Sequence, residues 1–407
     1  MRIMRTYRTL AIVLTLVVGA VGAAQAQTVK IGTATDLTGI GALIGKAGVA
    51  GMEVAIEEIN KKGGLLGRQV ELIVRDSKLR PEIGARELKE LVLNEKIDLA
   101  LGPVSSGVGL AESEVAKEFK VPICMHTSNT ERMTVERGHR YIFQLVPNTF
   151  MEGTMVAMRV AEKKEWKRYV LIGPDYDYGR TVAAAFTAKM AQLRPDVEIA
   201  KEFWPKLGEP DFTSYITGIL AQKPDVLYSI LWGGDMVGFL KQGQPYGVFE
   251  KVPLIWLSEL DTLRALGPDM IEGVIGHTRA PFYAITTKEI GAFIERYRGK
   301  TRNYPSDWAI QAYDCVSVLA QAVEAAKALD REKVVDVLES GRKFKTLRGE
   351  VYFRKEDHMG SVPYYAGVVK KTPIYSFMIL TDVRTYAAEQ IWRPVADIAK
   401  EREKVAK

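Results

Sequence analysis

Apolar residues along the chain alternate between two periods. Short apolar runs, the first at 29–33, have the length of buried strands. The segment after the first run instead places apolar side chains three or four residues apart, at Val49, Met52, Ile56 and Ile59, as on one face of a helix. Such alternation of strand and helix is typical of a parallel sheet covered by helices. The pattern therefore predicts an α/β fold.

The same rhythm occurs twice along the chain. In the first series the predicted strands are 29–33, 70–75, 97–101 and 121–125, and the predicted helices begin after Gly45 and at 81–94 and 108–119. In the second series, from about Pro147, they are strands 169–172, 197–203, 226–231, 254–257 and 274–277 and helices 151–164, 179–193 and 212–222. Helices are then expected at 288–298 and 307–328, followed by extended segments at 349–353, 364–369 and 374–381. This second series of alternating strands and helices predicts a second lobe.

The first 26 residues have the composition of a cleavable export signal. Arg2, Arg5 and Arg8 precede an apolar and small-residue run at 10–24, and residues 24–26 form an A-x-A cleavage pattern. The run is shorter than the roughly 20 residues that a membrane-spanning helix needs. We therefore expect cleavage after residue 26, no later segment long and apolar enough to span a membrane, and a soluble periplasmic protein.

The size and net charge of the protein are those of the chain without its leader. Removing 26 of 407 residues leaves 381, which exceeds the size at which a single core keeps growing, so two domains are expected. The full chain has 56 basic and 50 acidic residues, and the leader contains three arginines and no acidic residue, so the mature net charge is 53 minus 50, or +3. Because basic and acidic residues are interspersed, we expect no nucleic-acid partner.

Cys124 and Cys315 are the only cysteines. An oxidising compartment allows one disulfide between them. Their sequence neighbours are apolar, however, and free cysteine often packs as a small hydrophobic residue. We expect two buried free thiols, with the disulfide as the alternative.

The sequence contains no familiar catalytic or metal-binding motif. Its histidines lack metal-ligand spacing, and H-E-x-x-H, C-x-x-C and G-x-S-x-G do not occur. The glycine-rich loop at 39–45 has one residue too many for G-x-G-x-x-G. We therefore expect no metal, no cofactor and no catalytic residues, and a periplasmic hydrolase is a remote alternative.

Polar and aromatic residues follow several predicted strands, where open α/β sheets bind ligands. Ser105 and Ser106 stand at a predicted helix start, where a serine can cap the helix and free amide groups can hold a carboxylate. The other candidates that follow strands are Thr127, Asn129, Tyr176, Trp232 and Glu259. Each has a plain structural alternative, such as a turn, a solvated carboxylate or a core aromatic ring.

Several segments together are specific in their order and spacing. They read IGTATDLTGIGALIGKAGVAGMEVAIEEIN, GGLLGR, LGPVSSG, HTSNTERMT, YIFQLVPN, GPDYDYGR and LRGEVYFRKEDH. In these segments the chain resembles the branched-chain amino-acid (leucine/isoleucine/valine) binding family, the type I periplasmic solute-binding proteins of ATP-binding-cassette importers, over roughly residues 28 to 395. The resemblance implies two Rossmann-like lobes with parallel sheets, joined by a three-segment hinge that closes on a solute.

The resemblance also implies boundaries and site residues. Lobe 1 would contain 28–146 and 279–348, lobe 2 would contain 147–278 and 349–395, and 396–407 would be a charged tail. The implied site comprises Ser105 or Ser106, Thr127 and Asn129 for the ligand carboxylate and ammonium, Glu259 for the ammonium, Tyr176, Trp232 and Trp308 as aromatic walls, and Leu43 or Ile44 where relatives often carry tyrosine. Asn129 stands where the family usually has threonine.

The expected function is capture of a branched-chain, aliphatic or aromatic amino acid and its delivery to the membrane permease of an ABC importer. The expected protein is a monomer that binds without chemistry. With the same fold, the alternatives are an aromatic carboxylate, an amide or a urea-like solute as ligand, or a role as a ligand sensor. Glu259 is the residue on which the amino-acid hypothesis depends, because a carboxylate is a charge-assisted partner for an ammonium group.

Overall fold

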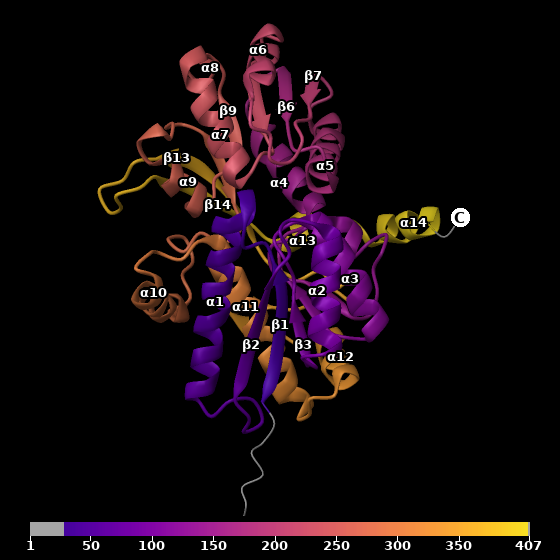
Figure 1. The fold of residues 1–407 in the computed structure, drawn as a ribbon. Helices are drawn as coiled ribbons and strands as arrows, with labels where there is room; N and C mark the ends of the chain where they lie inside the picture. Colours follow the sequence, from indigo (N-terminus) through magenta and orange to yellow (C-terminus); the bar gives the residue numbers. More distant parts are fainter. Residues whose placement is uncertain (1–27, 406–407) are drawn as a thin grey trace, which may run out of the picture.

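The computed structural model describes residues 28–405, so the predicted leader lies outside the described residues. A five-stranded parallel sheet forms the lower half of Figure 1, with strand order β2-β1-β3-β4-β5. The strands are β1 (Val29–Thr35), β2 (Val70–Asp76), β3 (Leu99–Leu101), β4 (Ile123–Met125) and β5 (Ile142–Gln144). Since nearly every residue of β1 is buried, this strand is covered on both faces, as parallel strands usually are.

Helices cover this sheet on both sides (Figure 1). They are α1 (Ala42–Lys61), α2 (Pro81–Leu93), α3 (Ser106–Phe119), α10 (Lys288–Thr301), α11 (Asp307–Ala326) and α12 (Arg331–Glu339). The short pair β11 (Phe344–Thr346) and β12 (Gly349–Val351) is antiparallel. We call this sheet with these helices the first lobe.

A seven-stranded sheet forms the other half, with strand order β14-β13-β10-β9-β8-β6-β7. The strands are β6 (Arg168–Ile172), β7 (Glu198–Phe203), β8 (Val226–Ser229), β9 (Leu254–Leu257), β10 (Ile275–Thr278), β13 (Tyr364–Lys370) and β14 (Ile379–Tyr386), of which β13 and β14 run antiparallel to their neighbours. The helices of this half are α4 (Thr149–Val160), α5 (Asp177–Leu193), α6 (Thr213–Ala221), α7 (Gly233–Gly243), α8 (Val248–Lys251) and α9 (Leu260–Leu266). After β14 the chain ends with α13 (Ala388–Ile391) and α14 (Val395–Val405). We call β6–β10, β13 and β14 with α4–α9 the second lobe.

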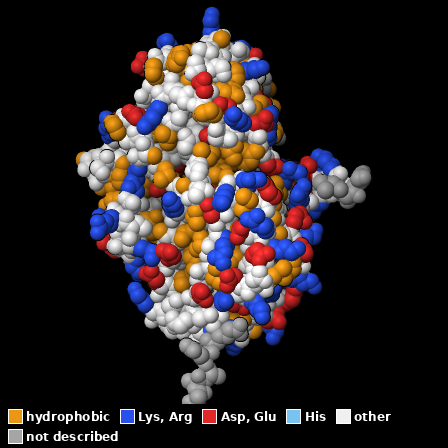
Figure 2. All heavy atoms as spheres, in the orientation of Figure 1, with side chains coloured by type: hydrophobic (Ala, Val, Ile, Leu, Met, Phe, Trp, Pro, Cys, Tyr) orange, Lys and Arg blue, Asp and Glu red, His pale blue; other side chains and the backbone are white. Residues whose placement is uncertain are grey.

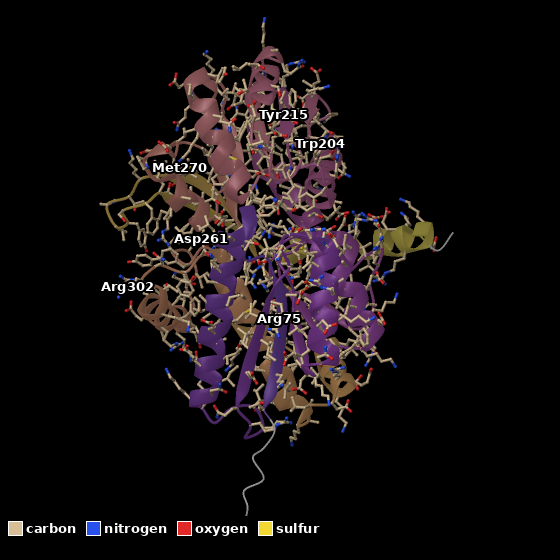
Figure 3. All side chains as sticks on the ribbon, viewed as in Figure 1. Arg75, Trp204, Tyr215, Asp261, Met270 and Arg302 are labelled. Carbon is tan, nitrogen blue, oxygen red and sulfur yellow. A yellow bond between two sulfur atoms is a disulfide. The ribbon has the colours of Figure 1, made fainter. Side chains whose placement is uncertain are left out.

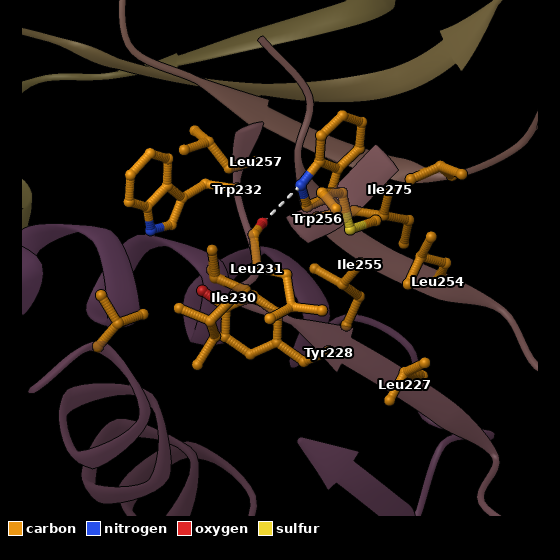
Figure 4. Packing of buried hydrophobic residues seen from close by; sticks show 14 of the residues in the cluster. Leu227, Tyr228, Ile230, Leu231, Trp232, Leu254, Ile255, Trp256, Leu257 and Ile275 are labelled. Carbon is orange, nitrogen blue, oxygen red and sulfur yellow. Dashed lines mark hydrogen bonds between the residues drawn. The ribbon is translucent and has the colours of Figure 1, made fainter. Parts of the chain in front are cut away.

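The core of the second lobe is packed around its central strands. Trp256 on β9 is completely buried, and its indole Nε1 donates a hydrogen bond of 2.9 Å to the carbonyl oxygen of Leu231 (Figure 4). This bond satisfies the one polar atom of a large apolar side chain, as burial of tryptophan requires. It also holds the ends of β8 and β9 together beside the cavity described below.

The chain passes between the two sheets three times. The crossings follow β5, β10 and β12. Each lobe therefore consists of separate chain segments, and the exact lobe boundaries stay a prediction. The α/β fold with two parallel-rich sheets is confirmed.

Some elements differ from the sequence-based expectation. β5, α12 and α7 were not expected, and glycine at the start of α7 lowers helix propensity. α7 forms because Met236, Phe239 and Leu240 bury one face of it. The predicted charged tail contains α14, whose Arg402 donates to the carbonyl oxygen of Val135 at 3.0 Å.

Two expectations are wrong. Cys124 on β4 and Cys315 on α11 form a disulfide with 5.8 Å between their Cα atoms, because α11 packs directly on the first sheet. The segment Gly39–Lys61 is long and apolar enough to span a membrane by length and composition, with a mean hydropathy of 1.4. In the fold, 56% of the most apolar 18-residue stretch of this segment is buried. The apolar side chains of α1 therefore pack in the core of the first lobe.

Candidate functional site

A small cavity lies between the two lobes, at the ends of strands from both sheets. The space between its walls is about 290 Å³ when the part open to solvent is included, and the two lobes stand close together around it. It is lined by Ile44, Val104, Ser106, Thr127, Asn129, Tyr176, Tyr178, Trp232, Leu257, Arg279 and Trp308. Seven of the predicted site residues are among them: Ile44, Ser106, Thr127, Asn129, Tyr176, Trp232 and Trp308.

Three predicted site residues lie outside this lining. Leu43 is half exposed on the outer side of α1, while the next residue, Ile44, faces the cavity. Ser105 contributes its backbone amide, which donates to Asp36 Oδ2 at 2.8 Å. Glu259 is completely buried and engaged elsewhere, as described below.

The loop after β4 supplies the polar wall. The hydroxyl of Ser106 accepts hydrogen bonds from the backbone amides of Asn129 at 3.3 Å and Thr130 at 3.2 Å. The hydroxyl of Thr127 lies 2.6 Å from Nδ1 of His126, and burial lowers the pKa of that histidine to about 4, so its ring is neutral. Ser106 also stands at the start of α3, where backbone N–H groups favour an anion.

Arg279 is the cation of the site, and it was not anticipated from the sequence. It follows β10 and is 2% exposed. Its Nη1 donates to the carbonyl oxygen of Thr127 at 3.0 Å, and its Nη2 donates to Glu152 Oε2 at 2.8 Å. The available signal was an arginine shortly after a predicted strand, but only the fold brings Arg279 beside the loop after β4.

The carboxylate of Glu152 on α4 accepts hydrogen bonds from three side chains. Besides Arg279, its Oε2 accepts from Asn129 Nδ2 at 3.2 Å, and its Oε1 accepts from the hydroxyl of Tyr178 at 2.8 Å. Burial by itself would raise the pKa of Glu152, but the charge of Arg279 and these hydrogen bonds outweigh it, and the pKa lies below the ordinary value. Glu152 and Arg279 are therefore a buried, fully charged pair.

Glu259 has a structural role at the start of α9. Its carboxylate caps this helix by accepting from the amide of Asp261 at 2.9 Å and from the amide and hydroxyl of Thr262. It also accepts from Nε1 of Trp308 at 3.2 Å. Burial, followed by the charge of Asp261, raises the pKa of Glu259 to about 8. Asp261 itself lies where the lobes meet (Figure 3).

Aromatic rings form the apolar walls. Tyr176 and Tyr178 lie at the start of α5 with ring centroids 6.1 Å apart, and Trp232 lies near Leu257 at the ends of β8 and β9 (Figure 4). The guanidinium of Arg279 lies 5.3 Å from the ring centroid of Trp308, within cation–π distance. The cavity thus combines flat apolar surfaces with one cation.

The lobes touch on both sides of the cavity. On one side Ile40 meets the start of α7, where a Cβ added to Gly234 would lie 3.2 Å from Ile40 Cβ. On the other side Arg132 Nη1 and Asp177 Oδ1 form an ion pair of 2.7 Å. Over the visible face basic and acidic side chains are interspersed (Figure 2). Within residues 28–405 no group of three histidine, cysteine or acidic side chains has the arrangement of a metal site.

Comparison with known proteins agrees with this architecture. The sequence matches the family described as periplasmic binding protein over residues 28–373. A Leu/Ile/Val-binding protein of Rhizobium johnstonii is 27% identical, over 80% of this chain and 87% of the relative.

Two solved structures have the same fold. An ABC-type branched-chain amino acid transporter protein of Rhodopseudomonas palustris is 25% identical with a TM-score of 0.73, covering 90% of this chain and 99% of that one. A solute-binding protein of an ABC transporter from Rhodopseudomonas palustris, in complex with p-hydroxybenzoic acid, is 22% identical with a TM-score of 0.81, covering 92% of this chain and 100% of that one. The family resemblance recognised in the sequence is thereby confirmed.

Proposed function

Because the chain belongs to the periplasmic binding protein family, we propose that it is the monomeric solute receptor of an ABC importer, which captures a small carboxylate with a flat apolar body between its lobes. Closure of the lobes holds the solute, and a membrane permease receives it. The chain binds its ligand without changing it. Export by the N-terminal leader places the receptor in the periplasm.

Arg279 is the single observation that carries this proposal. It is the one charged side chain in the cavity lining. Its guanidinium donates to Thr127 and Glu152 and also interacts with the hydroxyl of Tyr364, while its Nε has no hydrogen-bond partner among the described residues. A guanidinium has five N–H donors, so donors remain for a ligand carboxylate. The hydroxyls of Ser106 and Thr127 and the start of α3 add further donors.

The groups that could hold an ammonium are engaged. The carbonyl oxygen of Thr127 accepts from Arg279, Glu152 is paired with the same arginine, and Glu259 caps α9. An ammonium entering this cavity would also lie beside a buried cation, which is electrostatically unfavourable. These contacts support a carboxylate that has no amino group.

The aromatic walls support a planar ligand. Tyr176, Tyr178, Trp232 and Trp308 offer faces on which a ring can stack. The relative solved with p-hydroxybenzoic acid is a protein of the same fold with such a ligand. We therefore propose benzoate-like acids as the first ligands to test.

An amino acid is the second candidate, favoured by the relative named as a Leu/Ile/Val-binding protein. That candidate requires Glu259 to turn from α9 toward the cavity and meet the ammonium. A role as a ligand sensor would use the same cavity and differ only in the membrane partner.

Thermal shift assays with the mature protein separate these candidates. We expect benzoate and 4-hydroxybenzoate to raise the melting temperature, and L-leucine and L-phenylalanine to leave it unchanged. Mass spectrometry of the released ligand should recover it unaltered. If the amino acids raised the melting temperature and the aromatic acids did not, the carboxylate proposal would be wrong.

The Arg279→Gln variant tests the role of the arginine. A hydrogen bond from a charged donor contributes about 1.5–3 kcal/mol to the free energy of binding. Its loss should therefore raise the Kd for benzoate about 10- to 100-fold. Arg194→Gln is a matched control, because Arg194 is also buried, at 4% exposed, but pairs with Asp196 away from the cavity. It should lower stability without changing the Kd. Equal Kd values for the Arg279 variant and the native protein would refute the assignment.

A further inference from the structure

Glu152 stands behind the cavity wall rather than in it. It is completely buried on α4 and is absent from the residues that line the cavity. Its contact with a ligand therefore runs through Arg279, to which it is bonded at 2.8 Å. Asn129 and Tyr178, which do line the cavity, fix the two oxygens of the same carboxylate.

This arrangement determines the net charge beside the cavity. A buried arginine without a partner would be strongly destabilising, and Glu152 removes that cost in the absence of a ligand. The same negative charge then opposes any carboxylate that approaches Arg279, because little water separates charges in a buried site. Glu152 thus stabilises the unliganded protein at the expense of affinity for anions.

We propose that Glu152 is a resident counter-ion of Arg279, and that as a positioning residue it sets how strongly the cavity prefers a carboxylate over a neutral ligand of the same shape. The inference rests on the proposed function, since it assumes that the ligand carboxylate meets Arg279. A ligand shares the arginine with Glu152 and does not displace it, because Tyr178 and Asn129 hold the glutamate in place.

The test compares two probes of equal shape, benzoate and benzamide, by calorimetry on the mature protein. In Glu152→Gln the side chain keeps its size and loses its charge. We expect the Kd for benzoate to fall about tenfold while the Kd for benzamide changes less than about twofold. Asp357→Asn is the matched control: Asp357 is also buried and paired with an arginine, Arg354, whose Nε donates to it at 2.8 Å, but it lies outside the cavity lining. It should leave the ratio of the two Kd values unchanged.

A merely structural role for Glu152 predicts a different result. If Glu152→Gln weakened benzoate and benzamide by the same factor, or left their ratio unchanged, the counter-ion inference would be overturned while the carboxylate proposal stood. If the native protein bound neither probe, the benzoate-like ligand class would fail separately.

A second measurement tests the counter-ion without a ligand, and it also applies if Glu152→Gln fails to fold. The double variant Glu152→Gln/Arg279→Gln carries no buried charge at this position. It should melt at a higher temperature than either single variant, because each single change leaves one buried group unpaired. A double variant no more stable than the single ones would overturn the inference.

Discussion

The disulfide between Cys124 and Cys315 should contribute substantially to the stability of the first lobe. It closes a sequence separation of 191 residues, for which the loop-entropy relation gives about 5 kcal/mol, while measured disulfides usually contribute ~2–4 kcal/mol. Most of the second lobe lies within the closed loop, between β4 and α11. A free-energy loss of about 3–5 kcal/mol is therefore expected when the bond is absent.

Urea unfolding of the oxidised and the fully reduced protein measures this loss. Reduction should be performed in denaturant and refolding under reducing conditions, because both cysteines are completely buried. The reduced protein retains both sulfur atoms in the core, so the comparison isolates the covalent bond from any change in packing. Cys124→Ala/Cys315→Ala adds the packing loss and should be less stable still. Oxidised and reduced proteins that differ by less than about 1 kcal/mol in the free energy of unfolding would refute the reasoning.

Three further predictions concern closure of the lobes and pH. Asp177→Asn removes the partly exposed ion pair with Arg132 and should raise the rate of ligand release about two- to fivefold in stopped-flow measurements. The release rate of the native protein should rise with salt, and that of the variant should not. Gly234→Leu should hold the lobes apart at Ile40, which would weaken ligand binding and enlarge the radius of gyration in solution scattering; unchanged values of both would exclude the contact. Burial, then the charge of a nearby aspartate, raises the pKa of Glu112 well above its ordinary value, so the folded protein keeps a proton that the unfolded chain releases. Stability should therefore fall as pH rises above the ordinary glutamate pKa of 4.5, by at most ~1.4 kcal/mol per pH unit from this group, and Glu112→Gln should flatten the slope in chemical denaturation.

Much of the cavity could be found from the sequence because strand ends are local features. Thr127 and Asn129 directly follow a short apolar run, and the parallel arrangement brings such loops to one edge of the sheet. Glu259 also follows an apolar run, but its orientation depends on the helix that begins after it. At the start of a helix a carboxylate is the natural acceptor for unpaired amides, so α9 and Trp308 engage it.

Arg279 could not be identified in the same way. Its partners Thr127 and Glu152 are 152 and 127 residues away along the chain. No local pattern indicates a pair across such separations, and composition predicts an exposed arginine. The pair between Cys124 and Cys315 is of the same kind, because apolar neighbours describe burial and say nothing of which other residue is near.

The sequence by itself determined the α/β class, the two-lobed organisation, the family and most of the loops that face the cavity, because these depend on periodicity, turns and motifs within short stretches of chain. The tertiary structure decided which charges occupy that cavity. Three crossings between the sheets bring Arg279, Glu152 and the loop after β4 together, and burial then forces each charge to find a partner. The pairing holds the guanidinium of Arg279 at the cavity wall, and the proposed carboxylate ligand depends on that position.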